Sequence, residues 1–292
     1  MKIKVYTMDS FAKTKDGGNP AAIVLDADKL SEIEMKKLAS DIGFSETAFI
    51  MNSDKADLKV RFFTPTEEVD LCGHATIGCF YLMAEKGLLQ PGVYTQETRV
   101  GVLSVEITVD HLILMDQNIP EFFEVIDRAE IAKSLGISVS DLADDLQPQI
   151  VSTGMRDIMV PIKDLKTLQA ITPNMDLVSD VSAKYQVIGY HLFSLETMGG
   201  TAHCRNMAPL YGIPEESACG TANGALSSYL YHHKKISDEE ASSIIMEQGY
   251  TMSKPSEILA SIDTCNNAIQ RIRVGGKAKN IREMELEIQL EI

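Results

Sequence analysis

The chain has 292 residues, 45% hydrophobic and 24% charged, which is typical of a folded protein with two domains or one large one. Its formal charge of −15 repels phosphate backbones and anionic lipid surfaces, so it argues against nucleic-acid and membrane partners. No apolar run approaches the roughly 20 residues that span a bilayer, and Asp9 interrupts the N-terminus before a signal peptide forms, so we expect a cytoplasmic protein.

The sequence predicts neither a metal site nor an organic cofactor. The six histidines and five cysteines show no recurring ligand spacing, and the odd number of cysteines without a CxxC pair favours reduced thiols. A dinucleotide fingerprint, a Walker motif, a nucleophile elbow and a lysine in a cofactor-like setting are all missing from the sequence.

The first half of the chain is predicted to alternate strands and helices. Ser31 and Glu34 form a capping-box pattern that predicts the start of a helix, and Gly43 predicts its end. Small and apolar residues from 73 to 86 predict a helix that is buried on nearly all sides. Period-two alternation between turn residues predicts strands at 3–8, 21–25, 45–50, 58–63, 100–109 and 111–115.

The second half is predicted to contain the same kinds of helices and strands. It contains a second helix of small and apolar residues, from about 220 to 233, and a charged helix at 237–248. Short helices are predicted at 130–135 and 164–171, and strands at 158–161, 186–195, 270–274 and 283–292.

The two halves also share residues in the same order. The set Arg61, Pro65, Glu68, Cys72, Gly73 and Ala75 recurs as Arg205, Pro209, Glu215, Cys219, Gly220 and Ala222. Cys72 and Cys219 are 147 residues apart, which is close to half the chain. This period is too long for a solenoid and predicts two copies of one domain related by a pseudo-twofold axis.

In each half an acidic stretch leads into Cys-Gly and then a helix, so Cys72 and Cys219 lie where helices begin. Unpaired N–H groups and the helix dipole lower a thiol pKa at such a place and bind carboxylates. Two opposed thiols suit the removal of a proton from one face of a carbon acid and its return on the other. The alternative is that small cysteines merely pack well at helix starts.

Four further polar residues are candidates for the site, each with a plainer alternative. Glu46 lies in an apolar predicted strand, where it is exposed, paired, or buried with a raised pKa. His74, at the head of the first buried helix, either titrates near neutrality or donates a hydrogen bond. Glu216, three residues before Cys219, is reactive or a solvated carboxylate at a helix N-terminus. Asn19 follows Gly17-Gly18 and binds a ligand or shapes the turn.

Ordered motifs along the chain resemble the PhzF family of phenazine-biosynthesis-like proteins, which share the diaminopimelate epimerase-like fold. The resemblance covers almost the whole length. It is carried by Asp-Ser-Phe at 9–11, Gly-Asn-Pro-Ala-Ala-Ile-Val-Leu at 18–25, Ser-Glu-Thr-Ala-Phe at 45–49, Arg-Phe-Phe-Thr-Pro at 61–65, Cys-Gly-His-Ala-Thr at 72–76, Ser-Thr-Gly at 152–154, Gly-Tyr-Thr-Met at 249–252 with Pro-Ser at 255–256, and Val-Gly-Gly at 274–276.

The resemblance implies an α+β fold of two pseudo-symmetric domains, each a curved, mostly antiparallel sheet wrapped around a central helix. The N-terminal domain is expected at 1–117, completed by 277–292, and the C-terminal domain at 118–276. The family places its active site in the cleft between the domains, and its members often form homodimers.

The resemblance also implies roles for single residues. Glu46 matches the family's acid/base, and His74 and the amide of Gly73 are expected beside the substrate. Asn19, Gly220 and Thr221 are further expected substrate-binding residues.

The second half departs from the family pattern Glu-Asp-Pro-x-Thr-Gly-Ser-Ala, because this chain has Glu-Glu-Ser-Ala-Cys-Gly-Thr-Ala at 215–222. Glu216 replaces the aspartate that assists proton transfer, and its longer side chain could move the carboxylate by about one C–C bond. Cys219 replaces a threonine. It resembles the second cysteine of the related diaminopimelate epimerases and proline racemases, and Cys72 resembles the first.

Three functional hypotheses follow. The first is a cofactor-independent isomerase that moves a proton within a small carboxylate-bearing metabolite, with Glu46 as acid/base and Glu216 assisting. The second is an amino-acid racemase or epimerase that uses Cys72 and Cys219 as opposed base and acid. The third is a metabolite-binding protein that has lost the chemistry and would bind a ligand tightly without proton exchange. The substrate and any role in phenazine synthesis are beyond the sequence.

Overall fold

The computed structural model describes residues 2–266 and 268–287, and the chain divides into two compact units. Unit 1 comprises Met1–Asp116 and Gly275–Ile292, and unit 2 comprises Gln117–Val274. The expected domains, 1–117 with 277–292 and 118–276, have boundaries within one or two residues of these. Residues 288–292, the end of the predicted strand 283–292, lie outside the described residues.

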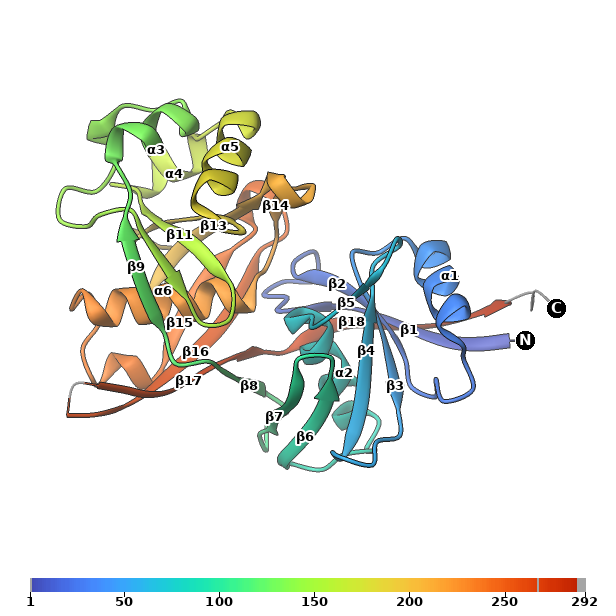
Figure 1. Ribbon diagram of the computed structural model, residues 1–292. Coiled ribbons are helices and arrows are strands. Elements are labelled where there is room, and N and C mark those ends of the chain that lie inside the picture. Colours follow the sequence, from blue (N-terminus) through green and yellow to red (C-terminus); the bar gives the residue numbers. More distant parts are fainter. Residues whose placement is uncertain (1, 267, 288–292) are drawn as a thin grey trace. The chain divides into compact units, whose positions relative to one another are not determined.

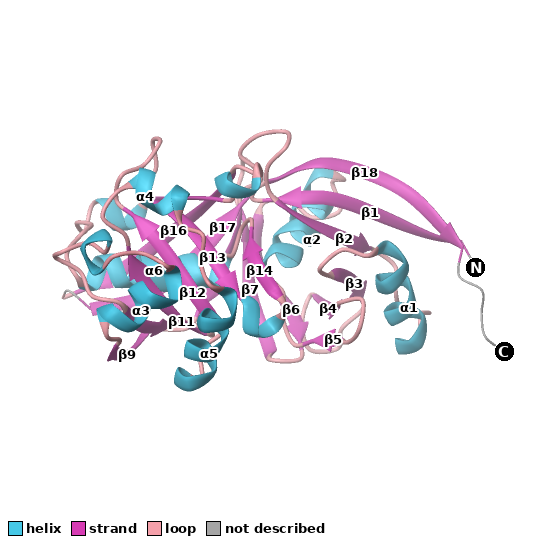
Figure 2. Ribbon diagram, turned by 90° about the horizontal axis from the view of Figure 1, so that it is seen from above, coloured by secondary structure: helices cyan, strands magenta, loops and turns pink. Residues whose placement is uncertain are grey.

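Unit 1 is a mixed sheet with two helices (Figure 1). Helix α1 is Glu32–Ile42 and helix α2 is Gly73–Glu85. The strands are β1 (Lys2–Ser10), β2 (Asn19–Val24), β3 (Thr47–Met51), β4 (Leu58–Phe63), β5 (Glu68–Val69), β6 (Gly92–Thr98), β7 (Gly101–Ile107), β8 (Ile113–Gln117) and β18 (Ala278–Glu287). Strands β1 and β18 lie side by side and pair antiparallel, as Figure 2 shows.

Unit 2 carries more helices than unit 1. They are α3 (Arg128–Leu135), α4 (Leu165–Ala170), α5 (Met175–Tyr185) and α6 (Gly220–His232), with 3-10 turns at Val139–Asp141, Pro209–Tyr211, Glu240–Ser242 and Tyr250–Met252. The strands are β9 (Glu121–Val125), β10 (Gln149–Ser152), β11 (Arg156–Pro161), β12 (Gly189–Ser194), β13 (Ala202–Ala208), β14 (Ile213–Glu216), β15 (Ile244–Gln248), β16 (Ser256–Cys265) and β17 (Ala268–Gly276).

The strands of both units pair in the same succession. Strands β2 and β3 are parallel across α1, as β11 and β12 are across α4 and α5. Antiparallel pairs then follow, β3–β4–β5 in unit 1 and β12–β13–β14 in unit 2. A second parallel pair spans the buried helix in each unit, β4–β6 across α2 and β13–β15 across α6. This shared order supports the internal duplication.

One ion pair is repeated at the same place in both units. Arg61 on β4 donates from Nε to Glu68 Oε1 at 2.7 Å, and Arg205 on β13 donates from Nε to Glu215 Oε1 at 2.9 Å. In each unit the pair ties the strand to the short strand that precedes the buried helix. The residues that repeat in the sequence therefore perform the same structural task.

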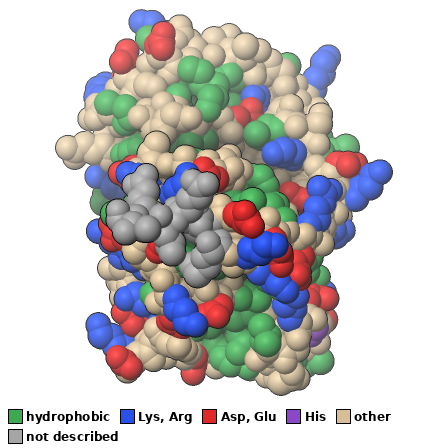
Figure 3. Space-filling model, turned by 90° about the vertical axis from the view of Figure 1, so that its right-hand side faces the viewer, with side chains coloured by type: hydrophobic (Ala, Val, Ile, Leu, Met, Phe, Trp, Pro, Cys, Tyr) green, Lys and Arg blue, Asp and Glu red, His purple; other side chains and the backbone are tan. Residues whose placement is uncertain are grey.

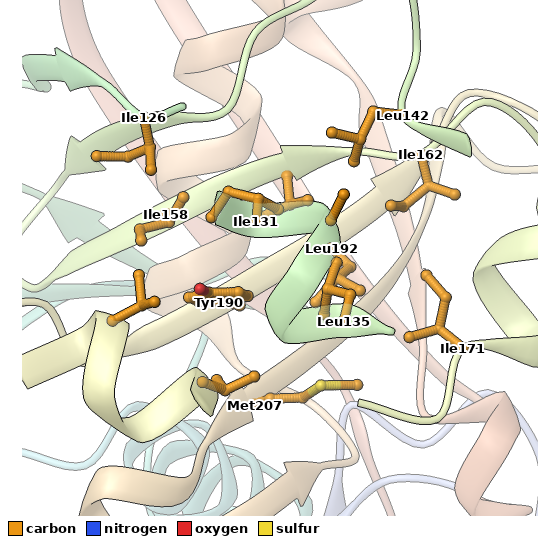
Figure 4. Close-up of a cluster of buried hydrophobic side chains, with 14 of the residues drawn as sticks. Ile126, Ile131, Leu135, Leu142, Ile158, Ile162, Ile171, Tyr190, Leu192 and Met207 are labelled. Atoms are coloured by element: carbon orange, nitrogen blue, oxygen red, sulfur yellow. The ribbon is translucent and has the colours of Figure 1, made fainter. Parts of the chain in front are cut away.

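The core of unit 2 has helices on both faces of the sheet. Alternate residues of β11 and β12, such as Ile158 and Leu192, pack against α3, α4 and α5 in the cluster of Figure 4. The opposite face packs on α6, where the rings of Phe193 and Tyr229 meet edge to face with centroids 5.7 Å apart. Helix α6 is therefore buried along most of its length, as the sequence predicted.

Unit 1 buries α2 in the same way and packs α1 on the other side of its sheet. Ten of the 13 residues of α2 are buried, and Gly78 allows close packing because a Cβ there would lie 3.1 Å from Ser10 Oγ. Met35 and Leu38 of α1 contact a cluster that includes Phe49 and Phe63. The two faces of the sheet are thus both covered.

On the face shown in Figure 3, basic and acidic side chains lie beside one another. Lys4 Nζ on β1 lies 2.8 Å from Glu283 Oε1 on β18, and Lys2 lies 3.7 Å from Glu285. These side chains are about half exposed, and such pairs contribute little stability. The cores, rather than surface ion pairs, hold the fold. Within the described residues no helix is both long and apolar enough to cross a bilayer.

Several predicted elements are confirmed, and one is wrong. Ser31 and Glu34 form both bonds of the capping box, and Gly43 ends α1 with φ 72°. The predicted helix at 237–248 is instead a 3-10 turn followed by β15, whose residues Ile244 to Gln248 fill the gap between β13 and β16. Charge around the strand suggested helical periodicity, but parallel pairing with β13 decided the structure. The prediction also missed α5 and the strands β5, β6, β9, β10, β13, β14 and β16.

Candidate active site

The two buried helices begin in the same way. Cys72 precedes α2 and Cys219 precedes α6, both extended, with φ −137° and −126° and no side-chain capping bond. Four residues on, Thr76 donates its hydroxyl to the Cys72 carbonyl at 2.9 Å, and Asn223 donates its amide to the Cys219 carbonyl at 2.8 Å. A side chain one turn into each helix thus holds the cysteine carbonyl, and at the start of α6 the N–H groups of Thr221 and Ala222 face the Cys219 thiol.

In unit 1 the helix start lies beside an imidazole and a carboxylate. His74 Nε2 is 3.3 Å from Glu46 Oε2, and Cys72 Sγ is 3.4 Å from His74 Nδ1. Asn19 Nδ2, at the start of β2, is also 3.3 Å from that Nδ1. Glu46 directly precedes β3 rather than lying within it, and its carbonyl accepts from Ala22 N at 3.4 Å. The fold thus brings four of the predicted residues together.

Burial determines the electrostatics of His74. Its side chain is only 5% exposed, and this burial lowers the pKa of His74, while the charge of Glu46 and a hydrogen bond to the Pro20 backbone oppose the shift. The Ser10 hydroxyl donates to the His74 carbonyl at 2.7 Å and fixes the helix start against β1. The imidazole is therefore neutral at pH 7 and can either accept or donate a proton.

Glu46 combines solvent access with an unsatisfied oxygen. Its side chain is 20% exposed, yet Oε2 is buried and makes no hydrogen bond. A buried carboxylate oxygen without a partner is rare in proteins and marks a group available to a ligand or a proton. Gly73, between Cys72 and His74, has no atom within 4 Å of the position of a Cβ, so space lies next to its backbone.

In unit 2 an amide network lies beneath the helix start. Gln248 Oε1 accepts from Cys219 N at 3.3 Å and from Asn223 Nδ2 at 2.7 Å. Its Nε2 donates to the Glu216 carbonyl at 2.8 Å. One fully buried side chain therefore ties together the end of β14, the cysteine and the first turn of α6. Thr153, from the Ser-Thr-Gly motif, donates to the Thr221 carbonyl at 3.3 Å and adds a second support.

The network fixes the tautomer of His191. Burial lowers the pKa of His191 to about 4, so the ring is neutral. Asn223 uses its amide nitrogen toward Cys219 and Gln248, which leaves its oxygen to accept from His191 Nε2 at 3.1 Å. Nδ1 must then be the acceptor, and Asn206 donates to it at 3.2 Å. All these bonds run in one direction toward the start of α6.

The expectation of a lowered thiol pKa is wrong for Cys219. N–H groups of Thr221 and Ala222 do lower it, as the helix start predicts. Burial and the charges of Glu216 and Asp157 outweigh them and raise the pKa of the Cys219 thiol well above its usual value. Cys219 is therefore a neutral thiol at pH 7.

The sequence reasoning missed Asp157, a carboxyl group on β11. Its side chain is 3% exposed, and Oδ1 is buried without a hydrogen bond. Burial raises the pKa of Asp157 to about 7, and a bond from the Gly189 backbone only partly opposes the shift. The signal was present in the sequence, because an acid adjoins the apolar run Ile158 to Val160 and takes the alternate face of the strand.

The candidate residues form one group in each unit. Unit 1 holds Asn19, Glu46, Cys72, Gly73 and His74, and unit 2 holds Glu216, Cys219, Gly220 and Thr221. Ligand-type atoms of Glu46, Cys72 and His74 all lie within 4.8 Å of one another. Sequence spacing did not indicate such a group, because Glu46 is far from the other two along the chain.

The fold and these groups define a class of proteins with two α/β units that share one strand order, each with a helix buried against its sheet. Residues 8–284 match the family described as phenazine biosynthesis-like protein, PhzC-PhzF. The chain is 37% identical to an uncharacterized isomerase of Clostridium acetobutylicum, over 98% of each chain. It is 27% identical to a trans-2,3-dihydro-3-hydroxyanthranilate isomerase of Pseudomonas chlororaphis, over 92% of this chain and 94% of that one.

Comparison with solved structures leads to the same family. A PhzF-family protein of Bacillus anthracis superposes with a TM-score of 0.89 at 33% identity, over 99% of this chain and 100% of that one. The chain belongs to the PhzC/PhzF family, has its diaminopimelate epimerase-like fold, and is an isomerase.

Proposed function

We propose that the protein moves a proton between atoms of a small carboxylate-bearing metabolite, with Glu46 as the acid/base. The observation that carries this proposal is the buried, unbonded Oε2 of Glu46, 3.3 Å from His74 Nε2. A carboxylate so placed can take a proton from a carbon acid and return it elsewhere, while the neutral imidazole binds or polarises the substrate.

The start of α2 supplies the second requirement, a place for the negative charge of the substrate. Backbone N–H groups at Gly73 and His74 and the positive end of the helix dipole favour a carboxylate there. The open space next to Gly73 lets a ligand approach this backbone. The relative from Pseudomonas chlororaphis is named for the isomerisation of an anthranilate derivative, which is itself a carboxylic acid.

In unit 2 we assign binding rather than proton transfer to Gly220 and Thr221, and an assisting role to Glu216. The Cys219 thiol is neutral and its N–H environment suits an anion. The homodimer remains a prediction, which light scattering coupled to size-exclusion chromatography measures.

A second candidate is a racemase in which Cys72 and Cys219 act as opposed base and acid. The equivalent placement of both cysteines before helices of 13 residues favours it. The raised pKa of the Cys219 thiol and the presence of Glu46 argue against it.

The deciding experiment incubates the protein in D₂O with amino acids and small unsaturated carboxylic acids, and follows proton exchange by NMR. We expect exchange that Glu46→Gln reduces about 100-fold or more and that Cys219→Ala leaves within a few-fold. The exposed Glu67→Gln is the matched control. Exchange at an amino-acid α-carbon that Cys219→Ala abolishes would instead establish the two-thiol racemase, and ligand binding without any exchange would contradict both.

A further inference from the structure

The register of the strands allows the two units to be aligned residue by residue. Arg61 on β4 lies opposite Phe49 on β3. Arg205 on β13 lies opposite Leu192 on β12 in the same way. The two arginines form equivalent ion pairs in their units, so Phe49 and Leu192 occupy equivalent positions. Strands β3 and β12 can therefore be compared position by position.

This alignment makes Gly189 the equivalent of Glu46, because each lies three residues before the aligned pair. The parallel neighbour of Gly189 is Asp157 on β11. The parallel neighbour of Glu46 is Ala21 on β2, one step before the first paired residues of β2 and β3, where the Ala22 N–H donates to the Glu46 carbonyl. Each unit thus has one carboxyl group and one small residue at this pair, on opposite strands.

Packing explains why the carboxyl group changes strand. A Cβ at Gly189 would lie 1.9 Å from the Met207 carbonyl oxygen on β13, so this position cannot hold a glutamate. Residues in register on neighbouring strands point to the same face of a sheet. Asp157 therefore brings a carboxyl group to the face of its sheet that Glu46 occupies in unit 1.

That face of the sheet in unit 2 packs on α6. Ile158, the next residue of β11, points into the cluster with α3, α4 and α5, so Asp157 points to the opposite side. The turn before β11 packs on the first turn of α6, where the Thr153 hydroxyl donates to the Thr221 carbonyl at 3.3 Å. The charge of Asp157 also acts on the Cys219 thiol. The carboxyl group is thus directed toward the start of α6.

Asp157 has a hydrogen-bonding atom that the folded chain does not use. Its side chain is 3% exposed, and Oδ1 is buried without a hydrogen bond. The titratable groups that adjoining elements bring to this face are the Cys219 thiol, Glu216 at the end of β14, and His191 on β12. Burial keeps the thiol and the imidazole uncharged at neutral pH. Burial also raises the pKa of Asp157 to about 7, so its charge changes in the neutral range.

We propose that Asp157 is the counterpart of Glu46 in unit 2 and that its protonation controls the binding of an anionic ligand at the start of α6. In its acid form the group is uncharged and leaves the positive end of the helix to attract a carboxylate. In its ionised form it places a buried negative charge beside that end and repels the ligand. The inference rests on the binding role proposed for unit 2 and adds the proton on which this binding depends.

The test follows the binding of benzoate, a simple carboxylate, through the NMR signal of the Thr221 amide in the full chain. It is run at about pH 6 and about pH 8.5, on either side of the expected titration. If only the acid form binds, the wild-type affinity should fall about 30-fold between these pH values. Asp157→Asn keeps the shape without the charge, so at both pH values it should bind as tightly as the wild type does in the acid form. Asp180→Asn, which changes an exposed acid of α5, is the matched control and should behave as the wild type.

The carboxyl ¹³C signal of Asp157 provides an independent check, because it should titrate at about pH 7. Titration near the usual value of 3.8 would overturn the proposal. So would the absence of benzoate binding by the wild type at the lower pH, or an unchanged pH dependence in Asp157→Asn. Neither measurement needs turnover. If the protein exchanges no substrate proton, the proposed function fails, while the benzoate titration still decides the role of Asp157.

Discussion

The starts of α2 and α6 have the same backbone and different surroundings. At α2 the cysteine lies beside an imidazole and a carboxylate, those of His74 and Glu46. At α6 the cysteine rests on Asn223 and Gln248, amides that cannot titrate, and its own pKa is raised. The same backbone thus carries titratable side chains in unit 1, where we propose the proton transfer, and uncharged amides in unit 2.

The candidate carboxylates of the two units should therefore differ most in their effect on catalysis. We expect Glu46→Gln to lower the rate of proton exchange by about 10²–10⁴-fold, the usual range for a general acid or base. Glu216→Gln should lower it by less than about 10-fold, because we propose only an assisting role for Glu216. The measurement is the exchange rate in D₂O on one responsive substrate. Equal losses in the two variants would mean that unit 2 shares the chemistry.

A buried acid in unit 2 and an exposed, hydrogen-bonded acid in unit 1 should change stability with pH in opposite directions. Asp157 has a folded pKa of about 7, above the usual value of 3.8. Ionisation of this carboxyl in the unfolded chain therefore opposes folding above about pH 4. The free energy of unfolding of Asp157→Asn should rise relative to that of the wild type between about pH 4 and 7. Above about pH 7 the difference should stay constant. Three pKa units set an upper limit of about 4 kcal/mol. Urea unfolding at several pH values measures this difference.

Asp57 in unit 1 is the matched control. Two bonds from Thr95 lower the pKa of Asp57, so its contribution to stability is present above the unfolded pKa and is lost as pH falls. Asp57→Asn should consequently be less stable than the wild type at neutral pH, with the difference vanishing in acid. A difference of the same sign in both variants would contradict the assigned burial of Asp157.

Two glycines with positive φ separate the cost of backbone strain from the cost of a steric clash, because only one of them has atoms close to the position of a Cβ. Gly249 in unit 2 has φ 81°, and a Cβ there would lie 2.3 Å from the Lys254 carbonyl and 2.6 Å from that of Ser217. Gly87 in unit 1 has φ 69° with nothing within 4 Å. Gly249→Ala should destabilise by about 3 kcal/mol or more, and Gly87→Ala by about 1 kcal/mol. Unfolding midpoints in urea measure both, and similar losses would show that Lys254 and Ser217 can move apart.

The repeated arginines should show the smallest contrast. Arg205, with a side chain 7% exposed, also donates from Nη1 to the carbonyls of Leu168 and Ile171 at 3.0 and 2.7 Å. Arg61, at 19% exposure, shares its second nitrogen between Glu68 and the exposed Glu32. Lysine cannot reproduce the forked contacts, so Arg205→Lys should cost about 2 kcal/mol and Arg61→Lys about 1 kcal/mol or less. Thermal unfolding compares them, and a larger loss for Arg61→Lys would reverse this interpretation.

Local signals predicted the fold well where the structure is decided locally. Neighbouring residues in the sequence determine the helix cap at Ser31 and the helix end at Gly43. The same holds for the apolar helices after Cys72 and Cys219. Strand β15 is different, because its pairing with β13 crosses the whole of α6. No short window of sequence contains that partner, so charge near 237–240 suggested a helix instead.

In the candidate site, too, the features that depend on residues distant in the sequence were not predicted. The resemblance pointed to Glu46 and His74, yet their 3.3 Å approach depends on α2 packing against the sheet that contains β3, which spacing along the chain does not show. The wrong pKa direction at Cys219 has the same origin, since the helix start was visible in sequence and the burial beside Asp157 was not. Predicting a titration requires the groups that face a residue from other elements.

Strand β18 has a consequence for the order in which the protein folds during synthesis. Unit 2 is one continuous segment, Gln117–Val274, so the whole of it is synthesised before β18. Unit 1 pairs β1 with β18, so its first strand waits for a partner while the whole of unit 2 is made. Domains generally fold as they emerge. We therefore expect the C-terminal unit to mature first and the N-terminal sheet, exposed along the edge of β1, to be the species most open to misassembly on the nascent chain.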